Sequence, residues 1–175
     1  FSGSQRQRLN LARALATRPK LLIVDDPLLA LDTVVQSQIV ELLADLKQTL
    51  NLTLLLLVSN FAHVRAISDR IGVLHLGEIV ELGKTDAVYE RPLHPHTQFI
   101  HSQTRPLEVI SDRLQPMQLT GPAPDPARLP SGCNFRTQCP YATDICRDEV
   151  PPLRDLSKSD QPHLASCHHA ERFQE

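Results

Sequence analysis

The chain has 175 residues, enough for one domain with a small appendage, and 41% of them are hydrophobic, which suffices for a core. The net charge of −2, the lack of a long basic block and an aromatic content of 4% argue against nucleic acid as the main partner. The longest apolar stretch, around 54–58, is too short to span a bilayer, and the first residues show no secretory signal. We therefore expect a cytosolic chain.

The first predicted elements are a helix and a strand. Ser2 and Ser4 are good N-cap residues, and residues 5–17 are rich in helix formers, so we predict a helix there. The run LLIV at 21–24 is apolar at every position. This pattern predicts a strand that is buried on both faces, as in a parallel sheet.

The next elements continue the alternation. Thr33 is predicted to cap a second amphipathic helix that ends at Asn51. TLLLLVSN at 53–60 predicts a second buried strand, and 61–69 a short helix. IGVLHLGEIVELG at 71–83 predicts two strands joined by a turn. Strands and helices in this order predict an α/β fold with a parallel sheet.

The remainder of the chain has a different composition. Most of the 14 prolines and all four cysteines lie in its second half. Short helices are predicted over 86–90 and 97–101, followed by a polar, proline-rich linker over 103–130. A cysteine-bearing module ends the chain. We see no internal repeats.

Four short motifs resemble one known family in order and spacing. They are FSGSQRQR at 1–8, LLIVDDP at 21–27, LALD at 29–32 and VSN at 58–60. Together they resemble the second half of an ABC-transporter nucleotide-binding subunit. RPLHPHTQFI at 91–100 and GCNFRTQCPYATDIC at 132–146 resemble the C-terminal extension of the oligopeptide/dipeptide importer branch.

The resemblance implies a partial P-loop NTPase-like fold, with a parallel sheet, flanking helices and a small cysteine-rich extension. It divides the chain into the C-terminal part of a nucleotide-binding domain (1–90), an extension and linker (91–130) and a cysteine-rich module (131–175).

The resemblance also assigns the loop at the start of the chain. In this family the signature loop, here Ser2, Gly3, Ser4 and Gln5, contacts the γ-phosphate of ATP that is held by the opposite subunit. A hydroxyl, a close backbone and a helix N-terminus together favour an anion. Ser4 stands where the family usually has a second glycine. The alternative is that Ser2 only caps a surface helix.

LLIVDDP resembles the Walker B motif. The resemblance implies that Asp25 holds Mg²⁺, usually through a water, at the carboxyl end of its strand. The next residue is normally a glutamate that polarises the attacking water, and here it is Asp26. Because this acid is one methylene shorter, we expect slower hydrolysis. The alternative is that both acids are merely solvated.

Two further positions follow from the same resemblance. Asp32 of LALD corresponds to the D-loop residue that bridges the two subunits. Asn60 stands where a switch histidine normally touches the γ-phosphate, and it carries no titratable proton. Ser4, Asp26 and Asn60 thus all depart from the family pattern, which indicates a weak or degenerate ATPase centre. It could be a noncatalytic half-site or a decayed gene product.

No segment of the sequence resembles the phosphate-cradling GxxxxGK[ST] loop. We expect that these residues alone cannot hold ATP in their own first half-site. The strands that accompany that loop should also be missing, which would leave apolar sheet surface uncovered.

The four cysteines are spaced C-x5-C-x6-C-x20-C, unlike a zinc ribbon or a ferredoxin run. Disulfides are disfavoured in a cytosolic protein, and a small proline-rich module favours a metal staple. The resemblance implies a [4Fe-4S] cluster on Cys133, Cys139, Cys146 and Cys167. Zn²⁺, free thiols and disulfides remain alternatives. We interpret HPH at 94–96 as a packing turn, and His63 and His75 as packed or solvated side chains.

The resemblance implies the ATP-binding subunit of an ABC importer for di- or oligopeptides, or for nickel and related solutes. Its expected partners are a second ATPase subunit, membrane permeases and, indirectly, a peptide-binding protein. The expected location is the cytoplasmic face of the inner or plasma membrane. The alternative is a nonenzymatic, metal-binding module that pairs with a full-length ATPase. An ATPase of DNA repair is disfavoured.

Overall fold

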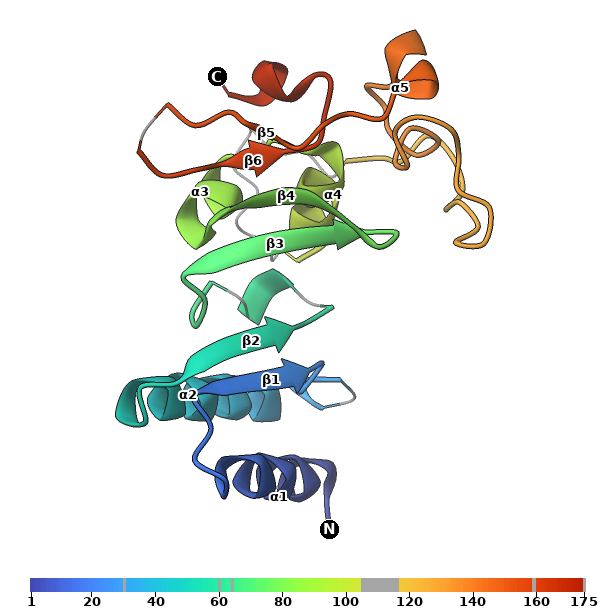
Figure 1. Ribbon diagram of the computed structural model, residues 1–175. Coiled ribbons are helices and arrows are strands. Elements are labelled where there is room, and N and C mark those ends of the chain that lie inside the picture. Colours follow the sequence, from blue (N-terminus) through green and yellow to red (C-terminus); the bar gives the residue numbers. More distant parts are fainter. Residues whose placement is uncertain (30, 60, 64, 105–116, 159, 175) are drawn as a thin grey trace. The chain divides into compact units, whose positions relative to one another are not determined.

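The computed structural model describes residues 1–29, 31–59, 61–63, 65–104, 117–158 and 160–174. The contacts divide the chain into two compact units, Phe1–Ile67 and Ser68–Glu175 (Figure 1). The predicted boundaries at residues 90 and 130 both fall inside the second unit.

The first unit is an α/β arrangement. Its elements are α1 (Gly3–Leu15), β1 (Leu21–Asp25), α2 (Thr33–Thr49), β2 (Thr53–Leu57) and the 3-10 helix η1 (Phe61–His63). β1 and β2 pair in parallel, with Ile23 opposite Leu55. The predicted α/β fold with parallel strands is therefore confirmed for this unit.

Local hydrogen bonds explain where the two long helices begin. Ser2 caps α1, as predicted. Asp32, rather than the predicted Thr33, caps α2, because its extended backbone lets its carboxylate accept the N–H of Val35 at 2.9 Å. Of the predicted helix over 61–69, only the three residues of η1 are helical among the residues that the structure describes, and a strand starts at Arg70.

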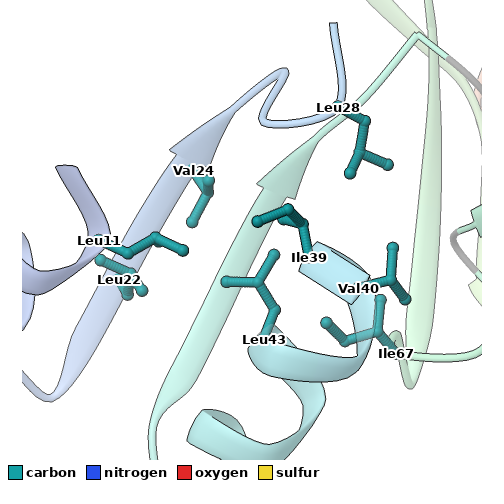
Figure 2. Close-up of a cluster of buried hydrophobic side chains, with 8 residues drawn as sticks. All are labelled: Leu11, Leu22, Val24, Leu28, Ile39, Val40, Leu43 and Ile67. Carbon is teal, nitrogen blue, oxygen red and sulfur yellow. The ribbon is translucent and has the colours of Figure 1, made fainter. Parts of the chain in front are cut away.

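The core of this unit lies on one face of the two strands. It is formed by the side chains drawn in Figure 2: Leu11, Leu22, Val24, Leu28, Ile39, Val40, Leu43 and Ile67. The alternate residues of the strands face the other way. Leu21, Ile23, Leu55 and Leu57 are between 41% and 58% exposed. The prediction of burial on both faces is therefore wrong for these strands, and the expected uncovered apolar surface is present.

The second unit is built on an antiparallel sheet. Its elements are β3 (Arg70–His75), β4 (Glu78–Lys84), α3 (Thr85–Glu90), α4 (Pro95–Thr104), α5 (Asp144–Asp148), β5 (Arg154–Asp155), β6 (Leu164–Ala165) and the 3-10 helix η3 (Ala170–Phe173). The strand order is β3-β4-β6-β5 (Figure 1). The turn between β3 and β4 is tight, since Leu76 and Gly77 both have positive φ (49° and 83°).

This sheet contains strands from distant parts of the sequence. Leu164 of β6 pairs with Leu82 of β4, so the cysteine-bearing region completes the sheet that the β3–β4 hairpin begins. The third predicted strand therefore does not extend the parallel sheet. Among the described residues no helix has the length and apolar character needed to cross a membrane.

Candidate functional site

The predicted signature residues form the first turn of α1. The N–H of Gln5 donates to Ser2 Oγ at 3.3 Å, and the N–H of Ser2 donates to Gln5 Oε1 at 2.9 Å. Ser4 Oγ lies 3.1 Å from Ser2 Oγ. These reciprocal bonds are a capping box. The side chains of Ser2 and Gln5 thereby fix the helix end, whose dipole is positive.

The two predicted acidic residues lie at the carboxyl end of β1. Asp25 ends the strand with an exposed side chain, and Asp26 follows it with a half-buried one. The N–H of Asp26 donates to the carbonyl of Leu57 at 2.8 Å, which continues the parallel ladder. Asp26 has a φ of 39°, in the left-handed region. Asp26 thus combines a hydrogen bond to the neighbouring strand with an uncommon backbone conformation.

Ser59, just beyond β2, contacts Asp26. Its hydroxyl donates to the Asp26 carboxylate at 3.1 Å (Oδ2) and 3.4 Å (Oδ1). The motifs in the sequence assign Ser59 no role, although its position at the end of a parallel strand is a signal for one. The adjacent Asn60 lies outside the described residues. Phe61 is buried (6% exposed) and therefore packs in the interior.

The turn before α2 lies against the start of α1. A Cβ added to Gly3 would come within 3.2 Å of Leu31 Cδ2, so any larger residue there would push against that side chain. The carboxylate of Asp32 is used in the cap of α2. The structure thus brings the signature turn and the LALD segment together within one unit.

The four cysteines lie in the second unit and line one pocket together with His94, Phe135 and His169. Burial raises the pKa of Cys139 to about 11 and that of Cys167 to about 12, and it also raises the pKa of Cys133. All four are free of disulfides. Unliganded, the thiols whose pKa is raised stay protonated at neutral pH.

The donor set of this pocket fits a thiophilic metal, since soft thiolates select zinc, Cu(I) and iron–sulfur clusters. The free space, about 10 Å³, is that of a single water molecule. Among the described residues no three His, Cys, Asp or Glu side chains are arranged around one ion. Side-chain movement would therefore have to open the pocket before a metal could enter.

Two known families match the chain. "ABC transporter" matches residues 1–29, which hold the signature turn and the acidic pair. "Oligopeptide/dipeptide transporter, C-terminal region" matches residues 80–146. The chain is 44% identical over 174 residues to the di/tripeptide transport ATP-binding protein DppF of Pseudomonas aeruginosa. The chain is thus similar in sequence to ATP-binding subunits of the oligopeptide/dipeptide branch of ABC transporters.

These alignments cover nearly all of this chain but only about half of each relative. The alignment with DppF covers 99% of this chain and 52% of DppF. The oligopeptide transport ATP-binding protein AppF of Bacillus subtilis is 40% identical over 171 residues, which are 96% of this chain and 50% of AppF. The chain thus spans about half the length of these relatives. Among solved structures, cbiO1 of Clostridium perfringens aligns with 51% of this chain and 36% of its own, with a TM-score of 0.49 and 28% identity.

The peptide-transporter region contains the HPH turn, which the structure describes as a packing turn, as predicted. His94 is 2% exposed, and its Nδ1 accepts the N–H of His96 at 3.0 Å. The rings of His75, His94 and His96 lie 5.1–5.8 Å from that of Phe135. In this chain the turn therefore packs three imidazoles around one phenyl ring.

The packing of these imidazoles predicts that acid destabilises the second unit. Burial lowers the pKa of His94 to about 3 and that of His96 to about 4. Below the ordinary histidine pKa of 6.5 the unfolded chain binds more protons than the folded chain. The contribution of these histidines to stability is therefore fully present above pH 6.5, and it is lost as the pH falls towards their pKa values in the folded state. We expect His96 to account for about 1–2 kcal/mol of the loss between about pH 7 and about pH 4.5.

Urea unfolding at both pH values measures this loss. The variant His96→Phe cannot take up the proton and should show a smaller difference between the two pH values. An unchanged difference in His96→Phe would contradict the assignment.

Gly132 fixes the backbone beside the first cysteine. It has a φ of 65°, and a Cβ there would lie 2.4 Å from the carbonyl oxygen of Cys146. We expect Gly132→Ala to lower the free energy of unfolding by about 1–3 kcal/mol, because both the φ and the contact oppose a side chain. Gly77→Ala is the matched control: it shares a positive φ, but nothing lies within 4 Å of the added Cβ. Equal losses in the two variants would show that the contact with Cys146 is unimportant.

Proposed function

We propose that the chain is the part of a peptide-importer ATP-binding subunit that supplies the signature loop, the Walker B acids and the D-loop. The observation that carries this proposal is the position of Asp25 and Asp26 at the carboxyl end of a parallel strand, beside Ser59. In open α/β sheets this edge is where ligands bind. The names of DppF and AppF, both described as peptide transport ATP-binding proteins, support the peptide substrate class.

Each candidate residue has a proposed role. Asp25 would hold Mg²⁺, which neutralises phosphate charge when bound. Asp26 would orient and polarise the attacking water, and Ser59 would steady its carboxylate through the hydrogen bond described above. Asn60 would donate its amide to the γ-phosphate. The turn Ser2–Gln5 would contact the ATP of an opposite subunit, with Asp32 bridging the two subunits nearby.

The proposed assembly follows from these roles. The subunit would pair with a second ATP-binding subunit, so that ATP lies between them, and would dock onto membrane permeases. A peptide-binding protein would deliver the solute. The subunit would then lie on the cytoplasmic face of the membrane as a peripheral protein. Nickel and related solutes are the alternative cargo, and nucleic acid has no place in this assembly.

A chimera tests the proposal. This chain would replace the matched part of P. aeruginosa DppF, and the chimera would be assayed for ATP hydrolysis and for peptide uptake in a strain without DppF. We expect slow but measurable hydrolysis that Asp25→Asn abolishes. If Asp25→Asn left the rate of hydrolysis unchanged, the proposed role of Asp25 in holding Mg²⁺ would be refuted. A chimera that binds its partner ATPase without any turnover would favour the nonenzymatic module instead.

A second proposal concerns the four cysteines. Because their thiols line one pocket, we propose that Cys133, Cys139, Cys146 and Cys167 hold a [4Fe-4S] cluster, with Zn²⁺ as the alternative. The metal would act as a structural staple or as a redox sensor. Anaerobic purification followed by iron, sulfide and zinc assays tests this. A colourless protein with one zinc per chain would show that the cysteines bind Zn²⁺ and not a cluster. A metal-free protein would refute both.

A further inference from the structure

Gln36 of α2 joins two segments that approach the candidate site from different strands. Its Nε2 donates to the carbonyl of Leu28 at 3.1 Å, and its Oε1 lies 3.1 Å from His63 Nε2. Both bonds are partly buried, and they span 8 and 27 residues of sequence. They are therefore tertiary contacts, which the local fold of α2 does not require.

The chemistry of the partners fixes how these groups are arranged. A backbone carbonyl can only accept, so Gln36 must present its NH₂ group to Leu28. Its Oε1, which is also only an acceptor, then faces His63. Hence His63 must carry a proton on Nε2, and a single amide orientation and a single tautomer satisfy both bonds.

The two bonds close a ring of contacts around Asp26. Leu28 lies in the turn that begins at Asp26, where the N–H of Leu29 donates to the carbonyl of Asp26 at 3.2 Å. His63 ends η1, only a few residues beyond Ser59. Ser59 in turn donates to the Asp26 carboxylate. The backbone and the carboxylate of Asp26 are thus tied, through different bonds, to the same segment after β2.

We propose that Gln36 and His63 are positioning residues that couple the segment after β2 to the turn that carries Asp26. A displacement of η1 would then change the tilt of the Asp26 backbone through Gln36 as well as through Ser59. The consequence for hydrolysis rests on the proposed function, whereas the coupling itself is a property of this chain alone.

Hydrogen exchange on the 175-residue chain tests the coupling. We expect Gln36→Leu to speed exchange of the Leu29 and Leu31 amides about fivefold, which corresponds to one lost hydrogen bond of about 1 kcal/mol. His63→Phe should have a similar effect, although among the described residues His63 has no hydrogen bond of its own to that turn. The double variant should be no faster than either single one, because both break the same relay.

Two further variants separate coupling from general loosening. His63→Gln keeps an N–H donor and should restore slow exchange. Gln38→Leu is the matched control, since Gln38 lies on the same helix but bonds the exposed Arg8 at 3.3 Å. The proposal is overturned if His63→Phe leaves the turn unchanged, if the effects of the two variants add, or if Gln38→Leu acts like Gln36→Leu.

In the DppF chimera, Gln36→Leu should lower kcat about tenfold with little change in KM for ATP, because a misplaced general base affects the chemical step. An inactive parent chimera would count against the proposed function and would leave the exchange result to decide the coupling. If the chimera is active and Gln36→Leu leaves its kcat unchanged, the proposed effect of the coupling on hydrolysis is refuted.

Discussion

Replacing Glu81 with alanine is expected to lower the free energy of unfolding of the second unit by about 3–5 kcal/mol, the usual cost of breaking a buried polar network. Glu81 is fully buried in β4. Its carboxyl oxygens accept the N–H groups of Leu93 and His94 at 2.8 and 2.9 Å, and Oε1 lies 2.7 Å from His163 Nε2. The alanine variant would leave all three groups buried without this partner.

Chemical denaturation followed by far-UV circular dichroism measures this effect. Glu81→Gln keeps acceptor capacity on one oxygen and should lose less stability than the alanine variant. Glu78→Ala is the matched control, because Glu78 lies on the same strand but is exposed, and among the described residues its side chain hydrogen-bonds only Asn134. We expect this control to cost under about 1 kcal/mol. Similar losses for Glu81→Ala and Glu78→Ala would show that the buried hydrogen bonds of Glu81 contribute no more to stability than an exposed one.

Asp26→Glu is expected to raise kcat for ATP hydrolysis in the DppF chimera by about 10- to 100-fold, since a shift of about 1 Å in a catalytic group changes rates on this scale. The added methylene would carry the carboxylate further from the backbone than the Asp26 carboxylate that Ser59 now holds. Steady-state kinetics with saturating ATP measures the effect. KM for ATP should change little, because the group acts mainly in the transition state.

The same substitution at Asp45 provides the control, because Asp45 lies exposed on α2 and away from this edge. Asp45→Glu should leave kcat unchanged. Asp26→Asn should reduce kcat further, since an amide cannot accept a proton from water. If Asp26→Glu lowered kcat, the acid at this position would not be limited by its reach, and the proposed origin of slow hydrolysis would be wrong.

The sequence predicted those features that depend on neighbouring residues. Ser2 could be identified as a helix cap, and the turn between the two strands of 71–83 as a turn, because the chemistry of each lies within a few residues. The start of α2 was misplaced by one residue, since Asp32 and Thr33 are both good caps and only the backbone conformation chooses between them. The acidic pair was placed correctly at a strand end by its pattern.

The features that the sequence did not predict depend on distant residues. Glu81 and His163 are 82 positions apart, and no local pattern indicates that they meet. The pairing of β6 with β4 likewise joins residues that are far apart in the sequence. Gln36 and His63 each fit an ordinary helical position, so their bond becomes visible only in the folded chain. The sequences of β1 and β2, in which apolar and polar residues do not alternate, predicted burial on two faces, but only one face is covered.

The left-handed backbone of Asp26 has an evolutionary consequence. Aspartate visits this region more readily than glutamate does, because its short side chain can bond locally. Under the proposed role of Asp26, the shorter acid would relieve the backbone at the expense of catalytic reach. Asp26→Glu should therefore gain turnover and lose roughly 0.5–1 kcal/mol of stability, the pattern of a stability–activity trade-off. A subunit that hydrolyses ATP slowly but has an unstrained turn at Asp26 would be the outcome of a trade-off that favours stability over activity.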